Sequence, residues 1–171
     1  MIVLGIDPGL ASTGYGVVRS GSGTRGGAEL VALDGGVIQT HASHTHELRL
    51  AEIHRSVAAL LDKHAPGAMA LEELYFGQNA RTAFDVGQAR GVVMLAAGQR
   101  SIPCSSYTPQ QVKGAVCGSG RADKEQVSRM VKALLGLTAE PRSHHMADAL
   151  AVAICHSNRA PVSAALAAVG A

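Results

Sequence analysis

The sequence has 171 residues, of which 47% are hydrophobic and 16% are charged, and its net charge at pH 7 is +2. This length suits one domain with a substantial core and is short for two, and the composition excludes extensive disorder. No apolar run approaches the ~18 residues that span a bilayer, so we expect a cytoplasmic protein with no membrane contact.

Three apolar segments at the start of the chain predict three strands. They cover residues 2–7, 15–20 and 28–40 and are separated by short Gly-rich turns, so we expect antiparallel neighbours. Apolar residues at helical spacing then predict a helix over residues 45–64. The short apolar run 67–74 predicts a fourth strand, parallel to the first.

The second half of the chain is predicted to be mostly helical. A helix over residues 81–100 precedes a fifth strand at 102–107, and a short helix begins at Pro109. Asp123 is expected to cap the next helix, and a last helix covers residues 143–156. The resulting order, β-β-β-α-β-α-β-α-α-α, is that of an α/β protein.

The elements up to residue 157 form one predicted domain. The remaining segment, residues 158–171, contains too little apolar bulk to be assigned to a core. We therefore expect domain 1–157 to be followed by a flexible C-terminal tail.

Two apolar strands more than 60 residues apart each end in an acid. Asp7 ends the first strand before Pro-Gly, and Glu72 and Glu73 end the fourth. Each acid alone would be read as a turn residue or a solvated strand end. Two carboxylates brought together at strand ends repel each other unless a cation compensates for their charge.

The segment "SHHMADAL" near the C-terminus adds a third acid. On a helix, Asp148 lies one turn beyond His144 and His145, so either imidazole can share its face. Asp7 and Glu72 together with this helix supply three acids and one imidazole. Such an oxygen-rich set is typical of a Mg²⁺ or Mn²⁺ site.

Four segments of the chain resemble the RuvC family of bacterial Holliday-junction resolvases, which are endonucleases of the RNase H-like superfamily. They are "GIDPGLASTGYGV", "LEELYFGQNARTAFDVGQARGV", "TPQQVKGAVCGSGRADKEQV" and "MADALAVAICH", and they occur in the family's order. The resemblance implies an RNase H-like α/β fold with a five-stranded mixed sheet flanked by helices, and a homodimer. It also implies metal-dependent, paired and symmetric cleavage of four-way DNA junctions in recombination and repair. The cleavage products would carry 5′-phosphate and 3′-hydroxyl ends, and the partners would be the branch-migration proteins RuvA and RuvB.

The resemblance also implies the roles of the acids. Asp7, Glu72 and Asp148 match the family's catalytic metal ligands, which hold two Mg²⁺ or Mn²⁺ ions. Some members have an aspartate three residues before the last acid, where this chain has His145. His145 would replace an oxygen anion by a nitrogen and so favour Mn²⁺, or act as a general acid or base. His144 remains its rival for this place.

The segment after the fourth strand contains candidate DNA contacts. Tyr75 matches a family position that holds an aromatic residue, and we expect it to wedge against unstacked bases. Phe76 is its aromatic neighbour, and packing beneath the loop is the alternative role for both. Gln78 and Asn79 can form hydrogen bonds with base edges or phosphates.

Basic residues and glycines supply the other expected contacts. Lys113, Arg121 and Lys124 match or neighbour basic family positions that hold the DNA backbone, so we expect binding to weaken with salt. Gly87 and Gly91 match the family's dimer interface. Glycine costs a helix about 1 kcal/mol, so their row also suggests that another backbone approaches them closely.

Two other classes of function are open to the sequence. A junction-binding module that has lost catalysis would keep the acids as remnants and would bind junctions without nicking them. An actin-like or sugar-kinase ATPase would use "GIDPG" as a phosphate loop, but it needs a second lobe for which 171 residues leave no room.

Two further groups of residues carry no expected metal role. The histidines of one loop have a spacing that fits no common zinc pattern, and the cysteines include no CxxC pair. These residues are His41, His44, His46, Cys104, Cys117 and Cys155.

Overall fold

The computed structural model describes the backbone of residues 1–22, 28–73 and 80–169, and the side chains of residues 1–21, 29–73 and 83–159. The strands are β1 (Ile2–Asp7), β2 (Ser12–Ser22), β3 (Ala28–Gln39), β4 (Ala68–Glu72) and β5 (Cys104–Tyr107). The helices are α1 (His46–His64), α2 (Ala80–Gly98), α3 (Pro109–Cys117), α4 (Lys124–Leu134) and α5 (His144–Val169). The predicted order of elements is confirmed.

Two predicted boundaries are wrong by more than two residues. β2 begins at Ser12 rather than Tyr15, because it pairs along its whole length with the long strand β3. α5 continues to Val169 rather than ending near His156, and its last turns are rich in alanine, the strongest helix former. The flexibility expected of residues 158–171 stays a prediction.

The five strands form one mixed sheet in the order β3-β2-β1-β4-β5. β1 pairs antiparallel with β2, and β2 with β3, as predicted for strands joined by short turns. β1 pairs parallel with β4, and β4 with β5. β1 and β4 therefore end at the same edge of the sheet.

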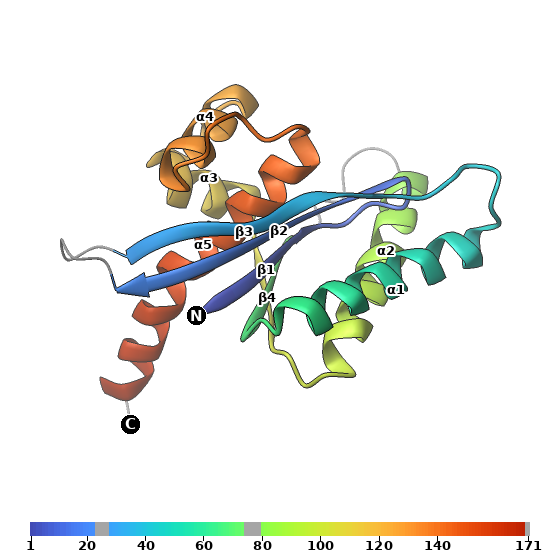
Figure 1. Ribbon diagram of the computed structural model, residues 1–171, viewed down its shortest axis with the longest axis horizontal. Helices are drawn as coiled ribbons and strands as arrows, with labels where there is room; N and C mark the ends of the chain where they lie inside the picture. The colour runs from blue at the N-terminus through green and yellow to red at the C-terminus, as the bar shows by residue number, and fades with distance from the viewer. Residues whose placement is uncertain (23–27, 74–79, 170–171) are drawn as a thin grey trace.

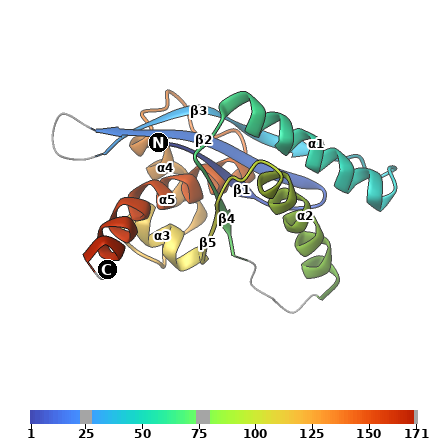
Figure 2. The same ribbon diagram turned by 90° about the horizontal axis from the view of Figure 1, so that it is seen from below.

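Helices cover both faces of the sheet (Figures 1 and 2). α1 and α2 pack against one face and α3, α4 and α5 against the other, and each interface has its own core cluster. The inner residues of β1, Val3 to Ile6, are buried because helices lie on both sides. No described helix combines the length and apolar character that crossing a membrane requires.

α5 lies unusually close to the centre of the sheet because three facing strand positions are glycine. A Cβ on Gly5 of β1 would overlap the carbonyl oxygen of Ala149, and one on Gly14 of β2 would overlap that of His145. Gly16 meets the side chain of Leu150 in the same way. The backbone of α5 therefore rests on the backbone of β1 and β2.

A methyl group at Gly14 should destabilise the fold. We expect Gly14→Ala to lower the free energy of unfolding by about 1–3 kcal/mol, because the rigid helix backbone cannot give way. The matched control is Gly21→Ala in the same strand, where a Cβ meets nothing within 4 Å, and its effect should stay within about 0.5 kcal/mol. Chemical denaturation measures both values, and equal effects would contradict this packing.

Candidate active site

The two strand-end acids emerge side by side from the sheet. The parallel pairing of β1 with β4 ends at Ile6 and Leu71, so Asp7 and Glu72 follow the last pair on both strands. Side chains alternate along a strand, and Ile6 and Leu71 face α1 and α2. Asp7 and Glu72 therefore project toward the opposite face, which α5 covers.

The first turns of α5 bring the other candidate ligands to the same place. Asp7 lies opposite Gly14 in the sheet, and Gly14 is the position on which the His145 backbone rests. The Nδ1 atom of His145 lies 2.7 Å from Oδ2 of Asp7. An ionised carboxylate can only accept, so Nδ1 donates to it, and in the neutral imidazole Nε2 then carries the lone pair.

His145, rather than His144, contacts the acids. Its imidazole is half exposed while the Asp7 side chain is 19% exposed, so the pair lies at the mouth of the site. His144 makes no hydrogen bond to an acid among the described residues, although its charge opposes the rise in the pKa of Asp148. A carboxylate that holds Nδ1–H of a histidine is a common support for metal ligation through Nε2.

Burial and mutual repulsion shift the acids toward their neutral forms. Burial, followed by the charges of Asp7 and Asp148, raises the pKa of Glu72 to about 7. Burial also raises the pKa of Asp7, against the hydrogen bond from His145, and raises that of Asp148, to which the charge of Asp7 adds. The three carboxyl groups are therefore protonated more easily than in water, mainly because they are buried.

The donor set suits a divalent cation, but its side chains are not drawn together. Within the described parts of the chain, no three His, Cys, Asp or Glu side chains stand close enough to hold one metal ion. Carboxylates without a cation between them repel each other, which favours their separation. Three acids and an imidazole with a free Nε2 nevertheless have the chemistry that Mn²⁺ or Mg²⁺ requires.

Comparison with known proteins gives the family. The family model described as "Crossover junction endodeoxyribonuclease RuvC" matches residues 3–156. The chain belongs to the RuvC family. The RuvC of Moorella thermoacetica is 50% identical over 161 residues, covering 94% of this chain and 93% of its own, and that of Thermomicrobium roseum is 49% identical over 156 residues, covering 91% and 92%.

Solved RuvC structures share the fold. The Thermus thermophilus RuvC structure has a TM-score of 0.87 at 40% identity, covering 95% of this chain and 97% of its own. The same organism's RuvC in complex with a Holliday junction substrate has a TM-score of 0.86 at 37% identity, with coverage of 95% and 96%. The yeast mitochondrial Holliday junction resolvase, at 16% identity and a TM-score of 0.59, shares the fold alone. The predicted RNase H-like α/β class is confirmed.

Two lysines of this RuvC-family chain lie within electrostatic reach of the acids. The charge of Lys124 opposes the rise in the pKa of Asp7, Glu72 and Asp148. Lys113 opposes the rise in the pKa of Glu72. Both lysines thus lie beside the site, on α3 and at the start of α4.

Arg121 and Arg129 line an open cavity of about 520 Å³ between α3 and α4. Asp123 caps α4 as predicted, because its side chain accepts a hydrogen bond from the backbone of Gln126. The predicted DNA contacts Tyr75, Phe76, Gln78 and Asn79 lie outside the described residues.

The glycine row of α2 faces open space within this chain. A Cβ on Gly87 or Gly91 would meet nothing within 4 Å. Exposed apolar side chains continue the same stripe, with Phe84 67% exposed and Leu95 54% exposed. No described part of the chain packs on this stripe.

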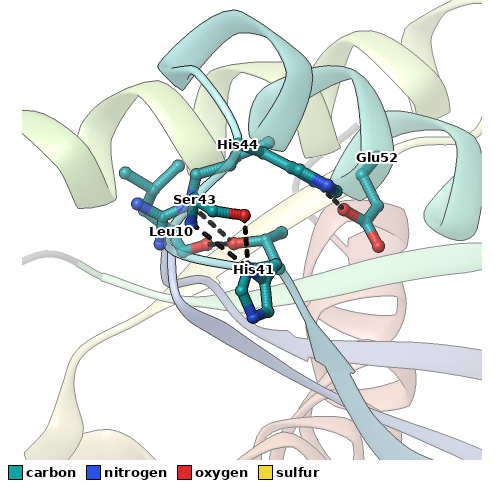
Figure 3. Close-up of polar contacts among 7 residues, drawn as sticks. Leu10, His41, Ser43, His44 and Glu52 are labelled. Atoms are coloured by element: carbon teal, nitrogen blue, oxygen red, sulfur yellow. Dashed lines mark hydrogen bonds and ion pairs between the residues drawn. The ribbon is translucent and has the colours of Figure 1, made fainter.

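The histidine loop forms contacts with protein groups (Figure 3). Nδ1 of His41 lies 2.6 Å from the hydroxyl of Ser43, and Nδ1 of His44 lies 3.8 Å from the Glu52 carboxylate. His46 binds Gln88 and so joins α1 to α2. These imidazoles therefore contact protein groups, and His46 links α1 to α2.

Sequence reasoning missed Thr13, which holds the turn after Asp7. Its side chain is fully buried, and its hydroxyl donates to the carbonyl of Gly9 at 2.7 Å and accepts from the Gly9 amide at 3.3 Å. The sequence contains a signal for this contact, because the hydroxyl of a threonine four residues after Gly9 can form hydrogen bonds with the backbone of Gly9. Thr13 therefore fixes the backbone that follows Asp7.

The raised pKa of Glu72 predicts how stability depends on pH. Without metal, the neutral carboxyl stabilises the fold below pH 4.5, and this contribution is lost as the pH rises through about 7. Glu72→Gln keeps a neutral group, so at pH 8 we expect the variant to be more stable than the wild type by about 1 kcal/mol or more.

Thermal unfolding in EDTA from pH 4 to pH 8 measures this difference. Glu73→Gln is the matched control, because Glu73 is exposed at the next position, and its effect on stability should stay within about 0.5 kcal/mol. A constant difference between Glu72→Gln and the wild type across this range would contradict the crowding of acids at the site.

Proposed function

We propose that this chain resolves four-way DNA junctions by metal-dependent hydrolysis of phosphodiester bonds, with Asp7, Glu72, Asp148 and His145 as the catalytic residues. The observation that carries the proposal is the placement of Asp7 and Glu72 at neighbouring strand ends beneath the start of α5. Membership of the RuvC crossover junction endodeoxyribonuclease family supports this class of reaction.

The acids would hold two Mg²⁺ or Mn²⁺ ions. Ions bound at such a site polarise the scissile phosphate and lower the pKa of a bound water. Glu72 must be ionised to act as a ligand, and the positive ions favour its ionised form. Asp7 orients His145, whose Nε2 can serve as a ligand or accept a proton.

Basic residues near the acids would hold the DNA backbone. Lys113 and Lys124 lie within electrostatic reach of the acids, where a phosphate can approach the site. Arg121 would also bind the backbone, and Tyr75, Phe76, Gln78 and Asn79 would contact the opened junction centre. Such contacts make binding depend steeply on salt.

A homodimer would supply two active sites for two opposed strands. The exposed apolar stripe on α2 around Gly87 and Gly91 supports this assignment, because it suits close helix packing against a second copy. The two-fold symmetry of a dimer matches symmetric nicks that leave 5′-phosphate and 3′-hydroxyl ends. RuvA and RuvB would be the partners in recombination and repair.

The decisive experiment is cleavage of a mobile synthetic junction with Mg²⁺ and Mn²⁺ in parallel. We expect paired, ligatable nicks in opposed strands. Asp7→Asn should lower the rate of nicking by a factor of about 10³ or more, because it removes the negative charge of a metal ligand. The variant should still bind the junction. Wild-type protein that binds junctions in either metal without nicking them would instead identify a binding module that has lost catalysis.

The dimer can be tested by filling its glycine row. Gly91→Leu should stabilise the helix of the monomer by about 1 kcal/mol, because a Cβ there meets no described atom within 4 Å. In the dimer the larger side chain would be overpacked, so the association constant should fall at least about tenfold. Analytical ultracentrifugation measures the association. Gly114→Leu on α3, where a Cβ also meets nothing within 4 Å, is the matched control. Equal association of the two variants would place the interface elsewhere.

A further inference from the structure

Glu72 is the last residue of β4, and it pairs with Tyr107 of β5. The pairs between β4 and β1 end one residue earlier, at Leu71 opposite Ile6. On the β5 side, the amide of Glu73 donates to the carbonyl of Tyr107 at 2.7 Å. The end of β4 is thus held by β5 on one side, and the carbonyl of Glu72 can accept a further contact that fixes its place beside Asp7.

Arg90 of α2 supplies that contact. Its Nη1 donates to the carbonyl oxygen of Glu72 at 2.7 Å, and its Nη2 donates to the hydroxyl of Ser106 on β5. The guanidinium is planar, so two acceptors on adjacent strands fix its orientation. The bond to Glu72 is partly buried, which protects it from competition with water.

We propose that Arg90 is a positioning residue for cleavage, which holds the last peptide of β4 so that the Glu72 carboxylate stays beside Asp7. The guanidinium bonds to the Glu72 backbone and not to its carboxylate, so its effect on the reaction is one of placement. The inference rests on the proposed function in one respect, that Glu72 is a metal ligand. It adds a residue outside the acidic cluster to the machinery of the reaction.

The test is Arg90→Met in the full-length protein, which keeps an unbranched apolar side chain and removes the guanidinium donors. On pre-bound junction, we expect single-turnover cleavage to slow by about 10–100-fold, because the metal ligand is displaced. Junction affinity in EDTA should stay within about twofold. Mn²⁺ affinity without DNA, measured by isothermal titration calorimetry, should fall by about tenfold.

Arg100→Met is the matched control for a general loss of stability. Arg100 follows α2 and bonds through Nε and Nη2 to the Asp62 carboxylate at 2.6 and 2.8 Å, far from the acids in the sequence. Its loss should lower the melting temperature and leave cleavage and Mn²⁺ affinity unchanged. If Arg90→Met does not fold, Arg90→Lys decides, because one ammonium cannot bind both acceptors in the same geometry and cleavage should slow several-fold.

Wild-type cleavage and Mn²⁺ affinity in a folded Arg90→Met protein would overturn the proposal. Slower cleavage with unchanged Mn²⁺ affinity would also overturn it, because Glu72 would then not have moved. A wild-type protein that binds Mn²⁺ but does not nick junctions would refute the proposed function alone. The Mn²⁺ titration would still decide the role of Arg90.

Discussion

The close contact between α5 and the centre of the sheet is the constraint on which the site depends. Gly5 and Gly14 have no side chain where the carbonyl oxygens of Ala149 and His145 approach. Any larger residue would lift the helix from the sheet. The first turn of α5 would then no longer lie over the end of β1, and the contact between His145 and Asp7 would be lost.

The same packing explains how the fold tolerates a repulsive site. β1 is buried between helices on both faces, so the Asp7 backbone cannot move to relieve the charge. Thr13 fixes the turn that follows it, and Arg90 holds the end of β4. Repulsion between carboxylates fixed in this way lowers the free energy of unfolding. Binding of a divalent ion would raise it again.

Much of this architecture was predictable from local patterns. Apolar periodicity gave the order of the elements, and acids at the ends of two strands indicated where Asp7 and Glu72 meet. Helical spacing left His144 and His145 equivalent, because only the docking angle of α5 determines which imidazole reaches Asp7. The bond from Arg90 to Glu72 joins a helix to a strand end and leaves no periodic signal.

The glycines of β2 and α2 differ in how far the sequence predicts their close contacts. Gly14 and Gly16 lie on the same face of β2, a spacing that indicates a close helix, whereas close approach was predicted for the glycine row of α2. Gly87 and Gly91 of that row meet no described residue of their own chain. The sequence around a glycine does not show whether the backbone that approaches it belongs to the same chain or to another.

The central claim is that α5 completes a metal site over the ends of β1 and β4. Anomalous scattering from a crystal of the wild-type protein soaked in Mn²⁺ tests it most directly. We expect Mn²⁺ bound by the carboxylates of Asp7, Glu72 and Asp148, with Nε2 of His145 as a ligand. Mn²⁺ bound elsewhere, or no anomalous peak between these side chains at saturating metal, would contradict it.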